Sequence, residues 1–452
     1  MLISFRVANF RSFKDEQELS LVRSSRLGGE RRGSAGSTWD ARFSPVAAIY
    51  GSNASGKSNL LLALKFMSDA IRESHARWSP EGGTPVEPFL LDAVHPAQPS
   101  RFEVEAIHAG TRVQYGFELD VHRIRQEWLY AYPNGRRQTW FERSTDADSP
   151  SEDWYFGKGL AGHNRMISEL TRPNSLFISA AAASSHKVLG ALSRDLTSRI
   201  RFADPDNADA RTQFTMFELE RRPDIAQRLQ QLLTSADLGI RAVQVTRKEW
   251  TAVDQDRFLE VVRALSDKET FDQNQPMLRD LLQEGPPRFE LLHATADGSP
   301  PTPLPYESES VGTRSLVALA GPALHVLDHG GVLLVDELDS SLHPRLVAEI
   351  VQLFQSAESN PNQAQLIFSS HDTSLLGHMA VDQPTLERDQ VWFVQKDPDG
   401  SSQLYPLTDF SPRKMENLER GYLQGRYGAV PFTDLATELA VPRLRPASGG
   451  DE

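Results

Sequence analysis

The feature that most constrains this chain is a glycine-rich octapeptide between an expected strand and an expected helix. It fits the pattern G-x-x-x-x-G-K-[ST] and consists of Gly51, Ser52, Asn53, Ala54, Ser55, Gly56, Lys57 and Ser58. The apolar run before it, residues 46–50 (VAAIY), is typical of a strand that is buried on both faces. The residues after it, 58–67 (SNLLLALKFM), are good helix formers without a breaker. This context predicts a phosphate-binding loop rather than a glycine-rich turn without a ligand.

Each residue type in this loop has a chemical reason to be there. Glycine residues let the backbone NH groups curl around phosphate oxygens, and the start of a helix adds free donors and a favourable dipole. Lys57 neutralises phosphate charge, and the hydroxyl of Ser58 is suited to ligate Mg²⁺. We therefore expect the loop to bind ATP together with Mg²⁺.

Two adjacent carboxylates supply a second part of the expected site. The run GVLLVDE, residues 331–337, places Asp336 and Glu337 at the end of a buried strand, where a sheet of this class binds its ligands. We expect Asp336 to hold Mg²⁺, directly or through water, and Glu337 to polarise the attacking water. If this run stood alone, a strand that simply ends in solvent-exposed acidic residues would be the better explanation. Because a phosphate loop precedes it in the same chain, we favour the metal and base site.

Further motifs follow in the order found in one group of ATPases. SVGT (310–313) occupies the place of an ABC signature and is followed by the carboxylate strand, then SSLHP (340–344), then SSHD (369–372). This order resembles the ABC-type ATPase heads of the RecF, SMC and OLD lineages. Within them, MLISFRVANFRSFKDEQELSLV, ESESVGTRSL, LLVDELDSSLHP and YLQGRYGAVP are similar to the stand-alone abortive-infection ATPases of the AbiL and RloA type. The resemblance covers residues 1–130 and 290–432 and is much weaker between them.

The resemblance implies a dimer that closes around two nucleotides. Ser310 and Gly312 would contact the γ-phosphate of the nucleotide held by the other subunit, and His371 would sense that phosphate as a catalytic residue. Ser310 and Thr313 also suit the start of a helix, where free NH groups attract anions. Without the other motifs, a plain helix cap at Ser310 and a capping or core histidine at His371 would be the better interpretations.

Two features depart from the family pattern. The signature has Val311 and Thr313 where transporters carry glycine and glutamine, and His343 replaces the usual aspartate in the loop after the carboxylates. The glutamine that links Mg²⁺ to the hinge between lobes has no clear counterpart, and Gln114 is only a candidate. Arg11, in the NFRSF turn, is an equally open candidate, as a nucleotide contact or as a surface arginine.

The pattern along the chain predicts an α/β protein. We expect an ABC-type P-loop ATPase with a mixed or mainly parallel sheet, an N-terminal antiparallel β lobe and a largely helical insertion. Residues 1–130 would form the lobe with the phosphate loop, 160–290 the insertion, 291–432 the lobe with the signature, carboxylates and switch histidine, and 442–452 a disordered tail. Besides residues 46–50, we expect strands at 2–7, 17–22, 102–107, 113–119, 332–335, 366–369, 391–394 and 403–407, and helices at 58–67, from Pro223 onward and at 344–354.

The composition excludes several kinds of site. The 452 residues contain no cysteine, which rules out disulfides, zinc–thiolate sites, iron–sulfur clusters and cysteine nucleophiles. The net charge of −13 repels phosphate backbones, so contact with nucleic acid would need a local basic patch. Near the N-terminus, the candidates for such a patch are Arg23, Arg26, Arg31 and Arg32. Their glycine-rich surroundings favour a solvated loop instead of a binding arm. Because no membrane span or signal peptide is present, we expect a cytoplasmic protein without membrane contact.

Four functional hypotheses remain from the sequence. The first is an ATPase, a homodimer or higher oligomer, that controls a separate effector in anti-phage defence, for example a nuclease encoded next to it. The insertion at 160–290 would then recognise the partner. The second is a RecF- or SMC-like DNA-maintenance ATPase, which leaves contact with nucleic acid open. An OLD-type nuclease is weaker because only about 80 residues follow His371, and the signature and the large insertion disfavour a transporter motor.

Overall fold

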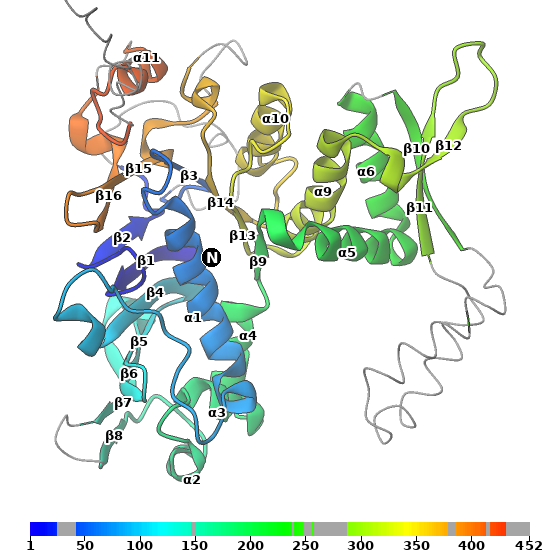
Figure 1. Ribbon diagram of the computed structural model, residues 1–452. Coiled ribbons are helices and arrows are strands. Elements are labelled where there is room, and N and C mark those ends of the chain that lie inside the picture. Colours follow the sequence, from blue (N-terminus) through cyan, green and yellow to red (C-terminus); the bar gives the residue numbers. More distant parts are fainter. Residues whose placement is uncertain are drawn as a thin grey trace, which may run out of the picture.

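The computed structural model describes residues 1–24, 42–145, 151–236, 239–247, 255, 287–377, 385–412 and 416–430. Figure 1 shows an antiparallel sheet and a mainly parallel sheet on either side of one long helix, with a smaller lobe beside the parallel sheet. The predicted α/β class is therefore confirmed. Of the residues named above, Arg26, Arg31, Arg32, the tail at 442–452 and most of 248–286 lie outside the described residues.

The antiparallel sheet has seven strands in the order β2-β1-β4-β5-β6-β7-β8. These are β1 (Leu2–Ala8), β2 (Gln17–Ser20), β4 (Ser100–His108), β5 (Thr111–Leu119), β6 (Ile124–Ala131), β7 (Gln138–Thr145) and β8 (Glu152–Phe156). The strands expected at 102–107 and 113–119 are confirmed as β4 and β5, which form a hairpin in which Ala109 and Gly110 both have positive φ, as a tight two-residue turn requires. The sheet runs on to Phe156, beyond the boundary at residue 130 set from the sequence.

The second sheet has six strands in the order β16-β15-β3-β14-β13-β9. These are β3 (Val46–Tyr50), β9 (Ile200–Ala203), β13 (Val332–Val335), β14 (Gln365–Ser369), β15 (Val391–Lys396) and β16 (Ser402–Pro406). All neighbouring pairs are parallel except β15 and β16. Strands β3, β13 and β14 are buried along their whole length, which explains their continuous apolar sequences. Their carboxyl ends lie at one edge of the sheet, so the loops that follow them lie close together.

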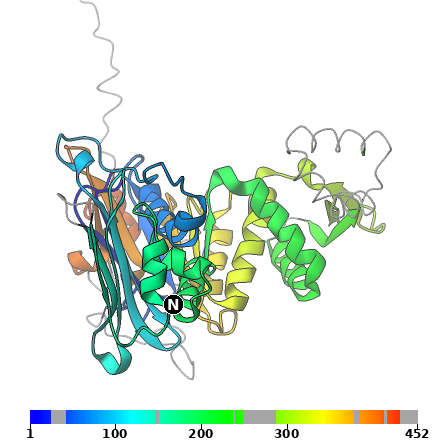
Figure 2. The same cartoon turned by 90° about the horizontal axis from the view of Figure 1, so that it is seen from below.

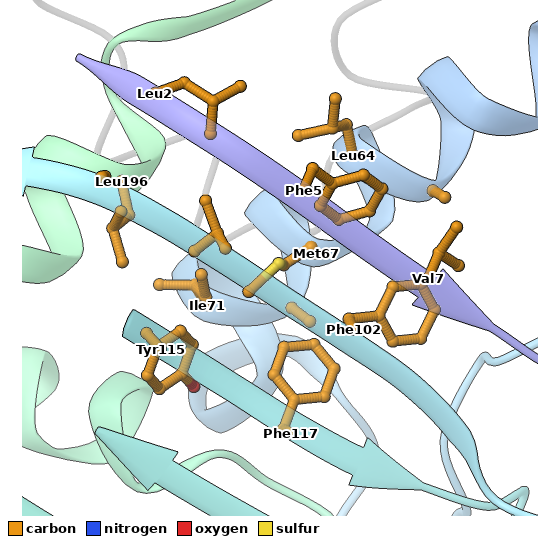
Figure 3. Packing of buried hydrophobic residues seen from close by; sticks show 14 of the residues in the cluster. Leu2, Phe5, Val7, Leu64, Met67, Ile71, Phe102, Tyr115, Phe117 and Leu196 are labelled. Carbon is orange, nitrogen blue, oxygen red and sulfur yellow. The ribbon is translucent and has the colours of Figure 1, made fainter. Parts of the chain in front are cut away.

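The long helix α1 (Lys57–Arg77) packs between the two sheets. Figure 3 shows Leu64, Met67 and Ile71 of α1 against Phe5 of β1 and Phe102 of β4 in one continuous core. The helix extends ten residues beyond the predicted end at Met67, because its apolar face continues through Ile71. Three short helices, α2 (Asn164–Leu170), α3 (Phe177–Ala183) and α4 (Lys187–Thr197), complete this side of the molecule, and α10 (Pro344–Gln355) lies on the other face of the parallel sheet.

In the part of the chain that the structure describes, the smaller lobe packs helices beside a three-stranded sheet (Figures 1 and 2). Its elements are α5 (Ala208–Arg221), α6 (Pro223–Ser235), α9 (Val311–His329), β10 (Ile240–Arg247), β11 (Pro287–His293) and β12 (Thr302–Pro305). The region 160–290 thus contains the expected helices but also β9, β10 and β11, which the sequence did not predict. Strand β9 pairs with β13, so this region contributes an edge strand to the main parallel sheet.

Near the end of the described chain, α11 (Leu418–Leu423) packs against a short 3₁₀ helix, η5 (Thr373–Leu376), that follows β14. The early arginine that the structure describes, Arg23, forms an ion pair with Glu387. It is therefore not a free basic arm. Among the described residues, no helix is long and apolar enough to cross a lipid bilayer.

Candidate functional site

The glycine-rich loop leaves β3 at Gly51 and enters α1 at Lys57, as the sequence predicts. Gly56 has φ 112°, a conformation that residues with a side chain rarely adopt. A Cβ on Gly56 would lie 2.4 Å from Ser402 Oγ and 2.7 Å from Ser12 Oγ, and one on Gly51 would lie 2.3 Å from the Val394 carbonyl oxygen. Close contacts within the chain therefore require glycine at both positions, and at Gly56 the loop conformation requires it as well.

The start of α1 offers unpaired backbone donors. The first turn of this helix, which the structure describes in full, contains no acidic residue, and no side chain caps it. The leading NH groups of a helix have no partner within the helix, and the positive end of its dipole attracts anions. A second unpaired group lies beside them, because the buried Ser55 Oγ has no hydrogen-bond partner among the described residues. This arrangement suits phosphate oxygens.

Lys57 lies inside the loop with 6% of its surface exposed. Its Nζ donates to the carbonyl oxygens of Gly51 at 3.0 Å and Ser52 at 3.1 Å. Burial lowers the pKa of the Lys57 ammonium, while the charges of Asp336 and Glu337 act in the opposite direction. The cation is thus held in a desolvated position next to the free NH groups, where an anion would be attracted strongly.

Two serines far apart in the sequence hold the phosphate loop from outside. Ser402 Oγ donates to the Ser55 carbonyl oxygen at 2.5 Å, and Ser402 N donates to the Ser12 carbonyl oxygen at 2.7 Å. Asn59 Nδ2 donates to Ser12 Oγ at 2.8 Å. Arg11 reaches Asn59 Oδ1 at 3.5 Å and pairs with Glu87 at 3.0 Å, so the turn that carries it borders the start of α1. Sequence reasoning missed both serines, which no local pattern marks.

The two carboxylates follow β13. Strand β14 lies between β13 and β3, the strand that leads into the phosphate loop. One hydroxyl connects the two acidic residues, because Ser369 Oγ donates to Asp336 Oδ1 at 2.5 Å and accepts from Glu337 N at 2.8 Å. Glu337 is exposed and has φ 53°, a left-handed conformation that is uncommon for glutamate. Ser369, which the sequence placed only within the SSHD motif, therefore fixes the backbone of one carboxylate and the side chain of the other.

His371 lies in the loop after β14, at the same edge of the sheet. Its backbone N donates to both carboxylate oxygens of Asp339, at 3.2 and 3.3 Å, and its side chain is exposed. Leu338 N donates to the Ser369 carbonyl oxygen at 3.0 Å. These bonds join the loop of the carboxylates to the loop of the histidine. The charge of Asp339 also acts on Lys57, so all three loops share one electrostatic environment.

The signature residues lie at the start of α9. Ser310 is its N-cap, and its Oγ accepts from Thr313 N at 3.1 Å. A Cβ on Gly312 would lie 2.7 Å from the Ser341 carbonyl oxygen, so α9 begins directly against the loop after the carboxylates. Val311 is 58% exposed. The structure thus brings Gly312 to the carboxylate loop, and no hydrogen bond within the described chain connects Ser310 to the phosphate loop.

The candidate hinge glutamine has a different environment. Gln114 lies within β5, where its Oε1 accepts from the Tyr132 hydroxyl at 2.7 Å. None of the hydrogen bonds found in the described ranges connects it to the phosphate loop. The structure therefore gives Gln114 a contact within the antiparallel sheet.

The donor set fits Mg²⁺ better than a metal bound by protein alone. Within the residues that the structure places, no group of three or more His, Asp or Glu side chains could hold a metal ion. Mg²⁺ is usually held by one or two protein ligands together with phosphate oxygens and water. Ser58 and Asp336 would be such ligands, since Ser58 lies in the first turn of α1 and Asp336 directly follows β13 at the same edge of the sheet.

Comparison with known proteins identifies the family to which this sequence is similar. A family model described as "AAA domain, putative AbiEii toxin, Type IV TA system" matches residues 46–377. Similar solved structures include an SMC head bound to the C-winged helix domain of ScpA (13% identity, TM-score 0.40, covering 89% of this chain and 96% of that chain). They also include an SMC head domain from Thermotoga maritima (14%, 0.37, 90% and 98%) and an Smc head domain bound to the C-terminal domain of ScpA derived from Pyrococcus furiosus (13%, 0.37, 91% and 97%). No curated protein matches the sequence.

Proposed function

The chain belongs to this AAA-domain family of P-loop NTPases, and we propose that it is a Mg-ATP-dependent ATPase that dimerises around nucleotide and controls a separate effector. The observation that carries the proposal is the arrangement of three loops at one edge of the parallel sheet. Lys57 and the free NH groups of α1 follow β3, Asp336 and Glu337 follow β13, and His371 follows β14 between them. A phosphate cradle, a metal ligand and an acidic residue for the attacking water are thus combined.

The residues divide the chemistry among themselves. Lys57 and the NH groups at the start of α1 bind and neutralise phosphate oxygens, while Ser58 and Asp336 would hold the metal. A Mg²⁺ ion held by these two residues would supply positive charge that neutralises the phosphates of the substrate. Glu337 orients the attacking water and takes up its proton, and the hydrogen bond from its backbone to Ser369 keeps it in place.

The signature helix supports the proposed dimer. Ser310 and Val311 are exposed at the start of α9, and no hydrogen bond of the described chain ties Ser310 to its own phosphate loop. A second subunit could therefore present Ser310 and Gly312, with the free NH groups of α9, to the γ-phosphate. By the resemblance stated above, His371 would sense that phosphate.

The biological role rests on the family and the resemblance. The family description names putative AbiEii toxins, and several phrases of this sequence resemble AbiL- and RloA-type ATPases. Both support a role in abortive infection, with a nuclease encoded nearby as one kind of effector. We place partner recognition in residues 160–290, whose helices α5 and α6 stand beside the parallel sheet (Figure 1), because segments carried on a rigid scaffold often recognise partners.

Hydrolysis and its dependence on Glu337 test the enzymatic part. The purified chain should hydrolyse ATP with Mg²⁺ and stop when the metal is chelated, and Glu337→Gln should retain ATP binding while turnover falls about 10²- to 10⁴-fold. Equal turnover by Glu337→Gln and the parental chain would reject the assigned base. Copurification with the product of the neighbouring gene, with and without ATP, tests the effector.

A further inference from the structure

The C-terminal segment 416–430 packs over the loop that carries His371, although the two lie far apart in the sequence (Figure 1). Thr373 Oγ1 donates to Glu419 Oε1 of α11 at 3.2 Å. A Cβ on Gly377 would lie 2.3 Å from Glu419 Oε2, so Glu419 also covers the end of this loop. One carboxylate thus contacts both ends of η5.

The same segment contacts the strand that leads into the phosphate loop. The ring of Tyr422 meets the ring of Tyr50 edge to face, with centroids 5.9 Å apart, and stacks on Phe393 at 5.3 Å. The Tyr50 hydroxyl donates to the Asp372 carbonyl oxygen at 3.1 Å. Tyr50, one position before Gly51, therefore lies between the C-terminal segment and the histidine loop.

The segment is itself held firmly. Tyr422 donates to the Ala429 carbonyl oxygen at 3.2 Å, and the Tyr405 hydroxyl on β16 donates to the Tyr427 carbonyl oxygen at 2.9 Å. The Tyr427 hydroxyl donates to Glu416 Oε1 at 2.5 Å. These bonds join both ends of the segment to each other and to the hairpin β15–β16. Glu419 therefore lies in a segment whose own position is held by hydrogen bonds.

The histidine loop makes few side-chain bonds of its own. Within the described structure, Asp372 Oδ2 and Ser374 Oγ are buried and have no hydrogen-bond partner. Hydrogen bonds from outside hold residues 371–377 at three points: Asp339 accepts from the His371 backbone, the Tyr50 hydroxyl donates to the Asp372 carbonyl oxygen, and Glu419 accepts from the Thr373 hydroxyl. Removing one of these three contacts should therefore change how often the loop leaves its observed position.

We infer that Glu419 is a positioning residue of the nucleotide site, which holds the His371 loop through the Thr373 hydroxyl. The inference rests on the proposed ATPase function. It assigns a role to a segment outside residues 46–377, the range that the family model matches. Glu419 and Tyr422 of this segment contact Thr373 and Tyr50 beside the site, so the placement of His371 depends on residues some fifty positions further along the chain.

Hydrogen exchange tests the contact without any need for hydrolysis. Glu419→Ala removes the acceptor and Thr373→Val removes the donor, whereas Glu419→Gln keeps a carbonyl acceptor. We expect amides of residues 371–377 to exchange about five-fold faster in the first two variants, the change expected for one lost hydrogen bond, and at the parental rate in Glu419→Gln. Gln424→Ala, an exposed change just after α11, is the matched control. Unchanged exchange in Glu419→Ala would overturn the inference.

Kinetics then tests positioning rather than mere support. Glu419→Ala should lower kcat about ten-fold, with ATP affinity unchanged, because a small displacement of an active-site group costs rate more than binding. Thr373→Val should have the same effect, and the double variant should be no worse than either single change. Faster exchange with parental kcat would overturn the positioning role. A parental chain without ATPase activity would instead reject the proposed function, and exchange alone would then decide whether Glu419 holds the loop.

Discussion

Ser369→Ala is the change that most directly tests how this site is built. Ser369 is fully buried at the end of β14, where its hydroxyl donates to Asp336 Oδ1 at 2.5 Å and accepts from Glu337 N at 2.8 Å. Alanine fits the same space and removes only the oxygen. The substitution therefore releases the proposed metal ligand and the proposed base together, without touching the phosphate loop.

The expected magnitude follows from these two bonds. A net hydrogen bond contributes about 1 kcal/mol, and about 1.5–3 kcal/mol when one partner is charged. Water will replace part of the loss, because Asp336 is half-buried and Glu337 is exposed. We expect the free energy of unfolding to fall by about 2 kcal/mol. Glu337, at φ 53°, then lacks the bond that holds its uncommon backbone conformation, and we expect kcat to fall about ten- to a hundredfold.

Denaturant unfolding and steady-state ATP hydrolysis measure the two effects, and calorimetry shows whether ATP still binds. Ser44→Ala is the matched control, since Ser44 is buried and its Oγ donates to the Val46 carbonyl oxygen at 2.8 Å, at the opposite end of β3 from the site. It should lose stability but keep its kcat. Parental turnover by Ser369→Ala, or an equal loss of turnover in Ser44→Ala, would refute the reasoning.

Two further experiments test separate parts of the site. Lys57→Ala should weaken ATP binding about a hundredfold or more, because it removes the charge from a desolvated cradle; unchanged affinity by calorimetry would count against the phosphate site. Glu337→Gln should accumulate as an ATP-bound dimer or tighter oligomer, and adding Ser310→Arg should prevent this while sparing ATP binding, since the bulky side chain blocks the approach to the partner's nucleotide. Light scattering after size exclusion, with and without Mg-ATP, measures both, and equal association of the two variants would leave Ser310 as a helix cap only.

The parts of the fold that could be predicted are those with a local cause. Strand β3, the phosphate loop and the start of α1 were predictable because a fully buried strand, a glycine pattern and a run of helix formers follow one another within about twenty residues. The same holds for β13 and its two carboxylates. In each case the chemistry follows directly from the end of a strand whose burial is visible in its own sequence.

The parts that were missed depend on contacts between distant segments. Ser12 and Ser402 hold the phosphate loop from positions 43 and 347 residues away from Ser55, and nothing in their own neighbourhoods indicates this. Strand β9 is four residues long and becomes a strand because β13 offers it an edge. In strand β10, Val243 and Val245 alternate with other residues, as expected for a strand. Because this pattern directly follows a helical pattern, the change from helix to strand was not predicted. Removing residues 160–290 as a unit would therefore take an edge strand from the main sheet.

The precision of the site is set by the register of three buried strands. In the parallel pairing of β13 with β14, Val335 lies opposite Phe368, so the next pair along the chain brings Asp336 to Ser369. On its other side β14 pairs with β3, where Ser369 lies opposite Ile49. A slip of one residue would turn Ser369 to the opposite face of the sheet and separate it from the carboxylates. Because these strands are continuous apolar runs, burial alone does not distinguish such registers. The Ser369 bonds at the end of β14 form only in the observed register and therefore favour it, together with the proposed catalytic geometry.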